Sequence, residues 1–136
     1  MRYGIVSDNR VLIDTSVWIA YFKNSLKQLT EKVDDVLTHG SVYVPKVVIA
    51  ELIQGAKTDK DSAVIEEFVN AFAVIDQTAD TWLKAGRLSF LMKKKGSMVH
   101  IIDCYIAILA NEHNCSILSL DEHFRSIQKF LKFDLL

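Results

Sequence analysis

The stretch "VLIDTSVWIAYF", residues 11–22, sets the acid Asp14 directly after three apolar residues and before a second apolar run. Residues 11–13 have the composition of a short buried strand, and Thr15 and Ser16 separate the acid from the apolar segment that follows. A carboxylate between two apolar segments is costly to desolvate unless a hydrogen bond or a cation compensates it. Asp14 therefore points to a special role at the end of the first predicted strand.

Short apolar runs recur along the chain, with helix-length sequence between them. They comprise residues 11–13, 42–44, 72–75 and 116–119. Most of their residues are β-branched or aromatic, which favours buried parallel strands. Strands that alternate with helices predict an α/β fold, a three-layer α/β/α sandwich around a short, mainly parallel sheet of four or five strands.

The segments between these strands have helical patterns. Helices are predicted over about residues 26–38, 45–55, 62–71, 78–95 and 99–113. Ser25 and Gln28 have the spacing of a capping box, and Gly40 suits a left-handed helix cap. Pro45 suits the first turn of a helix that ends near Gly55. The lysines before Gly96 suit the negative end of the fourth helix.

Size and composition favour one globular domain over residues 1–136. Half of the residues are apolar, 24% are charged and only one is proline, which is typical of a packed protein. A chain of this length buries one core but is short for two. Residues 1–9 precede the first predicted strand and are expected to form either an extra strand or a flexible N-terminal segment.

Charge and hydropathy exclude several classes of protein. A net charge of −1 disfavours a general nucleic-acid coat protein, so a nucleic-acid partner needs a local basic face. No apolar run reaches the roughly 18 residues of a membrane span, and the N-terminus lacks a secretory signal. We therefore expect a cytoplasmic protein, in which Cys104 and Cys115 are buried hydrophobic residues.

Four acids occupy positions where an ordinary surface acid is not expected. Asp14 and Asp121 follow the first and last predicted strands, whereas Glu51 and Asp103 lie in apolar helical segments. Ligand sites of parallel sheets lie beyond the carboxyl ends of the strands. Carboxylates about 5 Å apart repel by roughly 3 kcal/mol at an effective dielectric constant of about 20. Four converging acids therefore need a counter-charge.

Each acid also has a purely structural explanation. The two strand-end acids could cap the helices that follow them, and Asp103 could stabilise the first turn of its helix. Glu51 could pair with Lys46 or Lys57, which is the better explanation for Glu51 taken alone. The occurrence of all four acids together favours a shared site.

A divalent cation would remove the repulsion among these acids. A carboxylate-rich site without thiolate or imidazole suits Mg²⁺ or Mn²⁺ rather than zinc. The four histidines lack metal-ligand spacing and are predicted to be surface or helix-end residues: His39, His100, His113 and His123. Of these, His100 and His123 are expected near the site. The chain has no glycine-rich phosphate loop and no GxSxG motif. The remaining prediction is hydrolysis of a phosphodiester by a metal-activated water.

The order of the motifs resembles that of PIN-domain proteins, specifically the VapC-type ribonuclease toxins of bacterial and archaeal toxin–antitoxin pairs. The matching segments are "VLIDTSVWIAYF", "YVPKVVIAELIQGAK" and "KKGSMVHIIDCYIAILANEHNCSILSLDEHF". The similarity covers roughly residues 10–130. Ser119 stands where the family more often has threonine, and this change keeps the hydroxyl group.

This resemblance implies a metal-dependent endoribonuclease with a PIN-like fold. Its implied catalytic residues and ligands for Mg²⁺ or Mn²⁺ are Asp14, Glu51, Asp103 and Asp121. Hydroxyl residues that support the acids or a water are implied at Thr15, Ser16 and Ser119. The resemblance also implies RNA as substrate, a homodimer, and a cognate antitoxin whose tail covers the active-site groove.

Residues that contact RNA are less specific in the sequence. Four basic residues could position RNA phosphates, although basic residues at a helix end are more commonly just solvated: Arg87, Lys93, Lys94 and Lys95. Three aromatic residues could stack on RNA bases, but their helical spacing in an apolar segment favours packing in the core or in a dimer: Trp18, Tyr21 and Phe22.

Other functions remain compatible with parts of the sequence. A housekeeping RNA-processing or structure-specific nuclease would use the same acids, and an adjacent antitoxin-like reading frame distinguishes a toxin from it. A phospho-receiver domain also has strand-end acids, and Asp76 could be its phosphorylated residue. The last predicted strand, however, ends in an acid where a receiver needs a lysine. A non-catalytic binding domain is disfavoured because all four acids are present.

Overall fold

The computed structural model describes residues 9–136, which form four strands and seven helices. The strands are β1 (Arg10–Ile13), β2 (Ser41–Pro45), β3 (Ala73–Ile75) and β4 (Ser116–Leu118). The helices are α1 (Thr15–Lys23), α2 (Lys27–His39), α3 (Lys46–Gln54), α4 (Asp59–Val69), α5 (Thr81–Lys94), α6 (Ile101–His113) and α7 (His123–Ile127). The extra strand or flexible segment predicted within residues 1–9 falls almost wholly outside the described residues.

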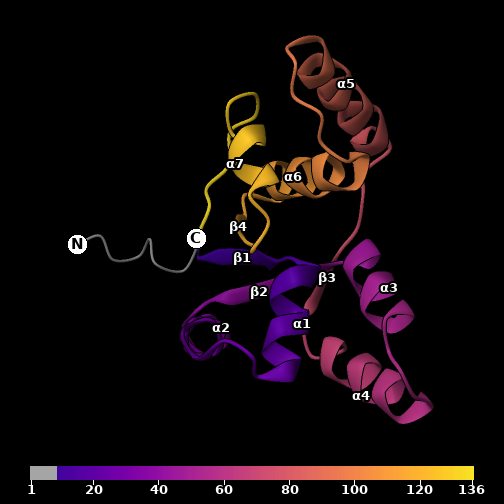
Figure 1. Ribbon diagram of the computed structural model, residues 1–136, viewed down its shortest axis with the longest axis vertical. Helices are drawn as coiled ribbons and strands as arrows, with labels where there is room; N and C mark the ends of the chain where they lie inside the picture. The colour runs from indigo at the N-terminus through magenta and orange to yellow at the C-terminus, as the bar shows by residue number, and fades with distance from the viewer. Residues whose placement is uncertain (1–8) are drawn as a thin grey trace.

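All strand pairs in the sheet are parallel, and the strand order is β3-β2-β1-β4. Helices α1 to α4 cover one face of the sheet and α5 to α7 cover the other (Figure 1). This arrangement confirms the predicted three-layer α/β/α fold. The chain moves from β1 outward to β3 and then returns to β4 on the other side of β1. The point between β1 and β4, where the direction reverses, is where such sheets bind ligands.

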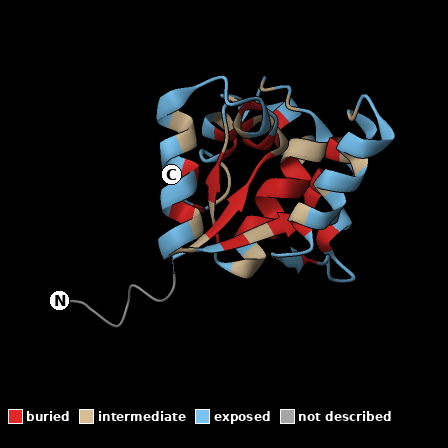
Figure 2. Ribbon diagram, turned by 90° about the horizontal axis from the view of Figure 1, so that it is seen from below, coloured by how far each residue is buried: buried red, intermediate tan, exposed pale blue. Residues whose placement is uncertain are grey.

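The core lies between the sheet and the inward faces of the helices. Most residues of β1 and β4 and the inner helix faces are buried, whereas the outer helix faces and two of the three residues of β3 are exposed (Figure 2). Residues 11–13 of β1 are fully buried, as is Trp18 of α1. The Trp18 ring packs against Phe68 and Phe72, with centroids 5.3 and 5.7 Å away. Trp18 is therefore a core residue, as favoured by the sequence, and its ring cannot stack on an RNA base.

Several predicted helix boundaries differ from those observed. The N-cap of α2 is Leu26 and no side chain caps it, so the predicted capping box of Ser25 and Gln28 is wrong. Gly40 has a φ of −113° and is not left-handed, because β2 begins at the next residue and the chain is already extended. Pro45 lies just before α3, as its N-cap, and not in the first turn. The short helix α7 was not predicted.

Both cysteines are buried and unpaired, as expected for small hydrophobic residues. Burial raises the pKa of the Cys115 thiol to about 11, so this thiol stays protonated near neutral pH. Among the described residues, no helix has both the length and the apolar character that crossing a membrane requires.

Candidate active site

Asp14 lies at the end of β1, directly before α1, and only 7% of it is exposed. Its backbone N–H donates to the carbonyl of Leu118 at 3.0 Å, which ties the end of β1 to the end of β4. Asp14 occupies the N-cap position of α1, but its side chain makes no capping hydrogen bond. Capping of α1 therefore does not explain this buried carboxylate.

Two serines hold the Asp14 carboxylate in place. Ser119 Oγ donates to Asp14 Oδ2 at 2.8 Å, and Ser16 Oγ donates to the same oxygen at 3.2 Å. Each serine oxygen also accepts a backbone N–H from the segment after β4, Ser119 from Asp121 at 2.9 Å and Ser16 from Leu120 at 3.1 Å. The serines thus connect Asp14 to the segment that carries Asp121.

Glu51 approaches this edge of the sheet from α3 and is partly buried. Its Oε1 accepts a hydrogen bond of 2.7 Å from Thr15 Oγ1. Lys46, one of its two predicted lysine partners, instead pairs with Asp76 at 3.0 Å. Among the ion pairs of residues 9–136 none involves Glu51, so the salt-bridge explanation for this acid is wrong.

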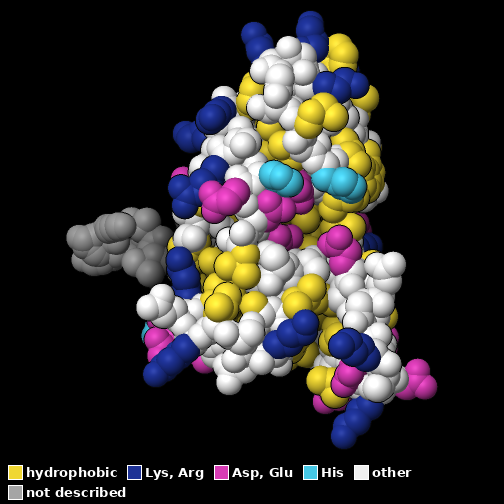
Figure 3. Space-filling model, in the orientation of Figure 1, with side chains coloured by type: hydrophobic (Ala, Val, Ile, Leu, Met, Phe, Trp, Pro, Cys, Tyr) yellow, Lys and Arg dark blue, Asp and Glu magenta, His cyan; other side chains and the backbone are white. Residues whose placement is uncertain are grey.

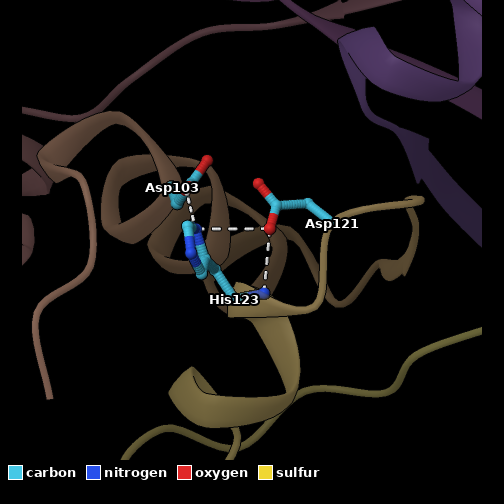
Figure 4. Close-up of side chains that lie close together, drawn as sticks. All are labelled: Asp103, Asp121 and His123. Carbon is cyan, nitrogen blue, oxygen red and sulfur yellow. Dashed lines mark hydrogen bonds and ion pairs between the residues drawn. The ribbon is translucent and has the colours of Figure 1, made fainter.

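Asp103 and Asp121 converge on His123. Asp103 comes from the first turn of α6, Asp121 follows β4, and His123 is the first residue of α7. His123 Nδ1 lies 3.3 Å from Asp103 Oδ2 and 3.2 Å from Asp121 Oδ1 (Figure 4). Acidic and histidine side chains gather at the middle of the face seen in Figure 3. Asp121 also accepts the His123 backbone N–H at 2.9 Å, so it partly caps α7 as well.

The pKa values of the acids show that their charges interact. Burial raises the pKa of Asp14, against the lowering effect of its hydrogen bonds, and the charge of Glu51 raises it further. Burial also raises the pKa of Asp103, and the charges of Asp121 and Asp14 add to this increase, whereas the hydrogen bond with His123 lowers it. The acids of α3, α6 and both strand ends therefore form one electrostatically coupled group.

The sequence predicted a site without imidazole, and the structure places the imidazole of His123 against two of the four acids. Within the described part of the chain, one group of three or more acidic, histidine or cysteine side chains has donor atoms within 4.8 Å of one another, and it contains His123 with Asp103 and Asp121. Sequence spacing missed it because Asp103 is 20 residues away from His123. The other histidines occupy the predicted surface or helix-end positions: His39, His100 and His113.

This donor set fits a divalent cation. Carboxylate oxygens are preferred ligands of Mg²⁺ and Mn²⁺, and imidazole is a good ligand for the transition metals. Raised pKa values at Asp14 and Asp103 mark carboxylates whose negative charges lack sufficient compensation from the protein. The cluster could therefore hold a metal ion, although the tight group of donor atoms does not include Asp14 or Glu51.

The family model of the PIN domain matches residues 11–130. The chain belongs to the PIN domain family. The phospho-receiver alternative is therefore wrong, and Asp76, the residue it required, lies at the far edge of the sheet after β3 and pairs with Lys46.

Relatives of this PIN domain include VapC ribonucleases. Ribonuclease VapC11 of Mycobacterium tuberculosis is 27% identical over 123 residues, which cover 88% of this chain and 92% of the relative. The tRNA(fMet)-specific endonuclease VapC of Shigella flexneri is 28% identical over 102 residues, 72% and 76% of the two chains. A solved VapBC-1 structure from nontypeable Haemophilus influenzae is similar to this chain, with a TM-score of 0.74 and a sequence identity of 22%. The similarity covers 93% of this chain and 97% of the solved chain. The last similarity confirms the PIN-like fold.

A groove of about 500 Å³ opens beside Glu51, between α1, α3 and α4 of the PIN domain. Its apolar lining includes Ile19, Phe22, Leu52, Val64 and Ile65. Its charged lining, besides Glu51, consists of three lysines and one acid: Lys23, Lys57, Lys60 and Asp61. The groove thus combines apolar side chains with three lysines and two acids, one of which is Glu51.

Proposed function

We propose that this PIN domain is a metal-dependent endoribonuclease and the toxin of a type II toxin–antitoxin pair, acting as a single domain in the cytoplasm. The observation that carries this proposal is the buried Asp14 carboxylate, which lies at the switch point of the sheet and is electrostatically coupled to Asp103. The names of the VapC relatives support ribonuclease activity.

The four acids Asp14, Glu51, Asp103 and Asp121 are the proposed ligands of Mg²⁺ or Mn²⁺. A bound divalent cation supplies Lewis-acid activation of a water molecule and charge stabilisation of the leaving oxygen. Ser119 and Ser16 fix one oxygen of Asp14, and Thr15 orients Glu51 through its 2.7 Å hydrogen bond. These hydroxyl groups pre-organise the acids, so that little rearrangement is needed when substrate binds.

RNA must approach this acidic site against electrostatic repulsion, so basic residues elsewhere have to position its phosphates. Arg87 and the three lysines at the end of α5 are exposed: Lys93, Lys94 and Lys95. Its role in RNA binding stays a prediction. The Lys94 ammonium lies 5.6 Å from the Phe90 ring centre, an arrangement that also suits a purely structural role.

The proposed antitoxin would place its tail in the groove beside Glu51. A lining of apolar side chains and lysines suits an amphipathic segment that has apolar side chains on one face and acidic groups at its edge. Solved structures of similar fold include a toxin–antitoxin complex from Klebsiella pneumoniae and a member of the VapBC family of toxin–antitoxin systems from Mycobacterium tuberculosis, which supports a protein partner. Val64 is 53% exposed and lines this groove. We expect Val64→Glu to weaken antitoxin binding in a pull-down while cleavage by the free protein is kept.

The proposed homodimer would use the apolar surface of α5. This helix exposes large side chains at several positions: Trp82, Leu83, Phe90 and Leu91. Hydrophobic side chains are visible over this part of the surface in Figure 3. Exposed apolar area of this kind is typical of interaction surfaces.

The proposed function is tested by expressing the wild-type protein and Asp14→Asn in parallel and mapping RNA 5′ ends. We expect new ends only with the wild type. Purified wild-type protein should cleave the identified RNA with Mg²⁺ or Mn²⁺ and stop in excess EDTA. Undiminished cleavage in EDTA, or full activity of the variant, would contradict the proposed mechanism.

A further inference from the structure

The imidazole of His123 faces the interior of the acid cluster. His123 follows Asp121 by two residues, and its Nδ1 contacts one oxygen of each neighbouring acid, at 3.3 Å for Asp103 and 3.2 Å for Asp121. Adjacent ligands of an octahedral ion with bonds of about 2.1 Å lie about 3 Å apart. His123 Nδ1 therefore lies at about the spacing of a neighbouring ligand from each of the two carboxylate oxygens, and all three donor atoms lie within 4.8 Å of one another.

The ring of His123 is not required for the local fold. The His123 backbone N–H already binds Asp121 Oδ1 at 2.9 Å, and any residue except proline can supply this donor. The His123 side chain is 53% exposed, so little core packing depends on it. By contrast, His39 pairs with one exposed acid, Asp35, and the ring of His100 caps α6. His123 differs from both because it joins two acids of the candidate site.

We propose that His123 is a metal ligand of this site through Nδ1, together with Asp103 and Asp121, and that it shifts the preference of the site from Mg²⁺ toward Mn²⁺. This inference rests on the proposed function and names the metal selectivity of the same site. Mg²⁺ binds oxygen almost exclusively, whereas imidazole is a favourable ligand for first-row transition metals. A single nitrogen ligand among carboxylates therefore stabilises bound Mn²⁺ more than bound Mg²⁺.

The direct test uses Mn²⁺ alone as a spectroscopic probe, without RNA. Pulsed electron paramagnetic resonance of Mn²⁺ bound to the wild-type protein should show coupling to a nitrogen-14 nucleus. The coupling should disappear in His123→Ala and persist in His100→Asn, the matched control at a neighbouring helix end. Absence of nitrogen coupling in the wild type, or its persistence in His123→Ala, overturns the assignment.

The selectivity is measured by calorimetric titration of the same proteins with Mn²⁺ and with Mg²⁺. Loss of the imidazole should reduce Mn²⁺ affinity by about tenfold or more, the scale on which ligand-sphere changes act in metal sites, while Mg²⁺ affinity changes less. The His100→Asn control should keep the wild-type ratio of the two affinities. An equal loss of both affinities would contradict the proposed preference for Mn²⁺.

These experiments separate the inference from the proposed ribonuclease activity. Nitrogen coupling in a protein that cleaves no RNA would support the His123 ligand and reject the nuclease. Metal-dependent cleavage without nitrogen coupling would support the nuclease and reject the ligand. Circular dichroism of His123→Ala should match the wild type, because the side chain is half exposed.

Discussion

Asp14 and Asp76 each follow a parallel strand directly, yet the structure gives them opposite environments. Asp14 comes after β1, is 7% exposed and has a raised pKa, mainly because of burial. Asp76 comes after β3, is exposed and has a lowered pKa, mainly because Lys46 donates a hydrogen bond to it. In sequence both are single acids at the end of an apolar run. Their difference arises from the places of β1 and β3 in the sheet.

The strand order explains this contrast. β1 lies in the interior of the sheet between β2 and β4, and the crevice for ligands lies beyond the carboxyl ends of the strands at the switch point. β3 is an edge strand, so the residue after it reaches solvent and can pair with a flexible lysine. Asp14, at the switch point, therefore has no cationic side chain of residues 9–136 as a partner and is available to bind a metal ion. Asp76, at the edge strand, forms an ordinary surface ion pair.

The largest difference between the two acids is expected in catalysis. Asp14→Asn should lower RNA cleavage by at least about 100-fold, the scale of losing a pre-organised electrostatic group. Asp76→Asn should cleave at nearly the wild-type rate, because Asp76 follows the edge strand β3, which β2 separates from β1. Initial rates on the identified RNA with saturating Mn²⁺ measure both. Similar losses in the two variants would remove the distinction between these acids.

A smaller effect is expected when the support of Asp14 is removed. Ser119→Ala deletes the 2.8 Å hydrogen bond to Asp14, and this bond lowers the pKa of the acid. Because its loss disfavours the ionised, metal-binding form, we expect metal affinity and cleavage to fall by about tenfold. Titration calorimetry and cleavage assays measure these losses. Ser41→Ala, at an exposed serine of β2, serves as the control and should behave as wild type.

The smallest expected effect is a change in the stability of the metal-free protein, with opposite pH dependence for the two acids. The raised pKa of Asp14 means that its stabilising contribution is complete below the usual value of 3.8 and is lost as pH rises through the raised value. At pH 7 in EDTA, Asp14→Asn should therefore raise Tm by a few degrees. This gain should shrink toward acidic pH.

The same thermal scans test Asp76. The lowered pKa of Asp76 gives a stabilising contribution that is present above 3.8 and is lost as pH falls through the lowered value. Asp76→Asn should therefore lower Tm slightly at pH 7 and have no effect in strong acid. A stability loss at pH 7 in Asp14→Asn would contradict the view that Asp14 is an uncompensated charge.

The sequence predicted the positions of all four strands and the carboxyl edge on which Asp14 and Asp121 lie. Apolar runs of β-branched residues are local signals, and a parallel sheet places all strand ends at one edge. Local signals failed at Ser25, whose hydroxyl donates to the Ala20 carbonyl of α1 instead of capping α2, and at Gly40, where β2 begins at the next residue. The signal for His123 was its proximity to Asp121, but no spacing rule connects it with Asp103, which comes from a different element.

The sequence by itself determined the alternation of strands and helices, the core and the identity of the acids, because hydrophobic periodicity and residue chemistry act over short ranges of the chain. Only the tertiary structure decided that Asp14 is held by two serines, that Glu51 binds Thr15 and not a lysine, and that an imidazole lies between Asp103 and Asp121. These contacts join residues from separate elements. Their geometry depends on the strand order, which local sequence does not specify.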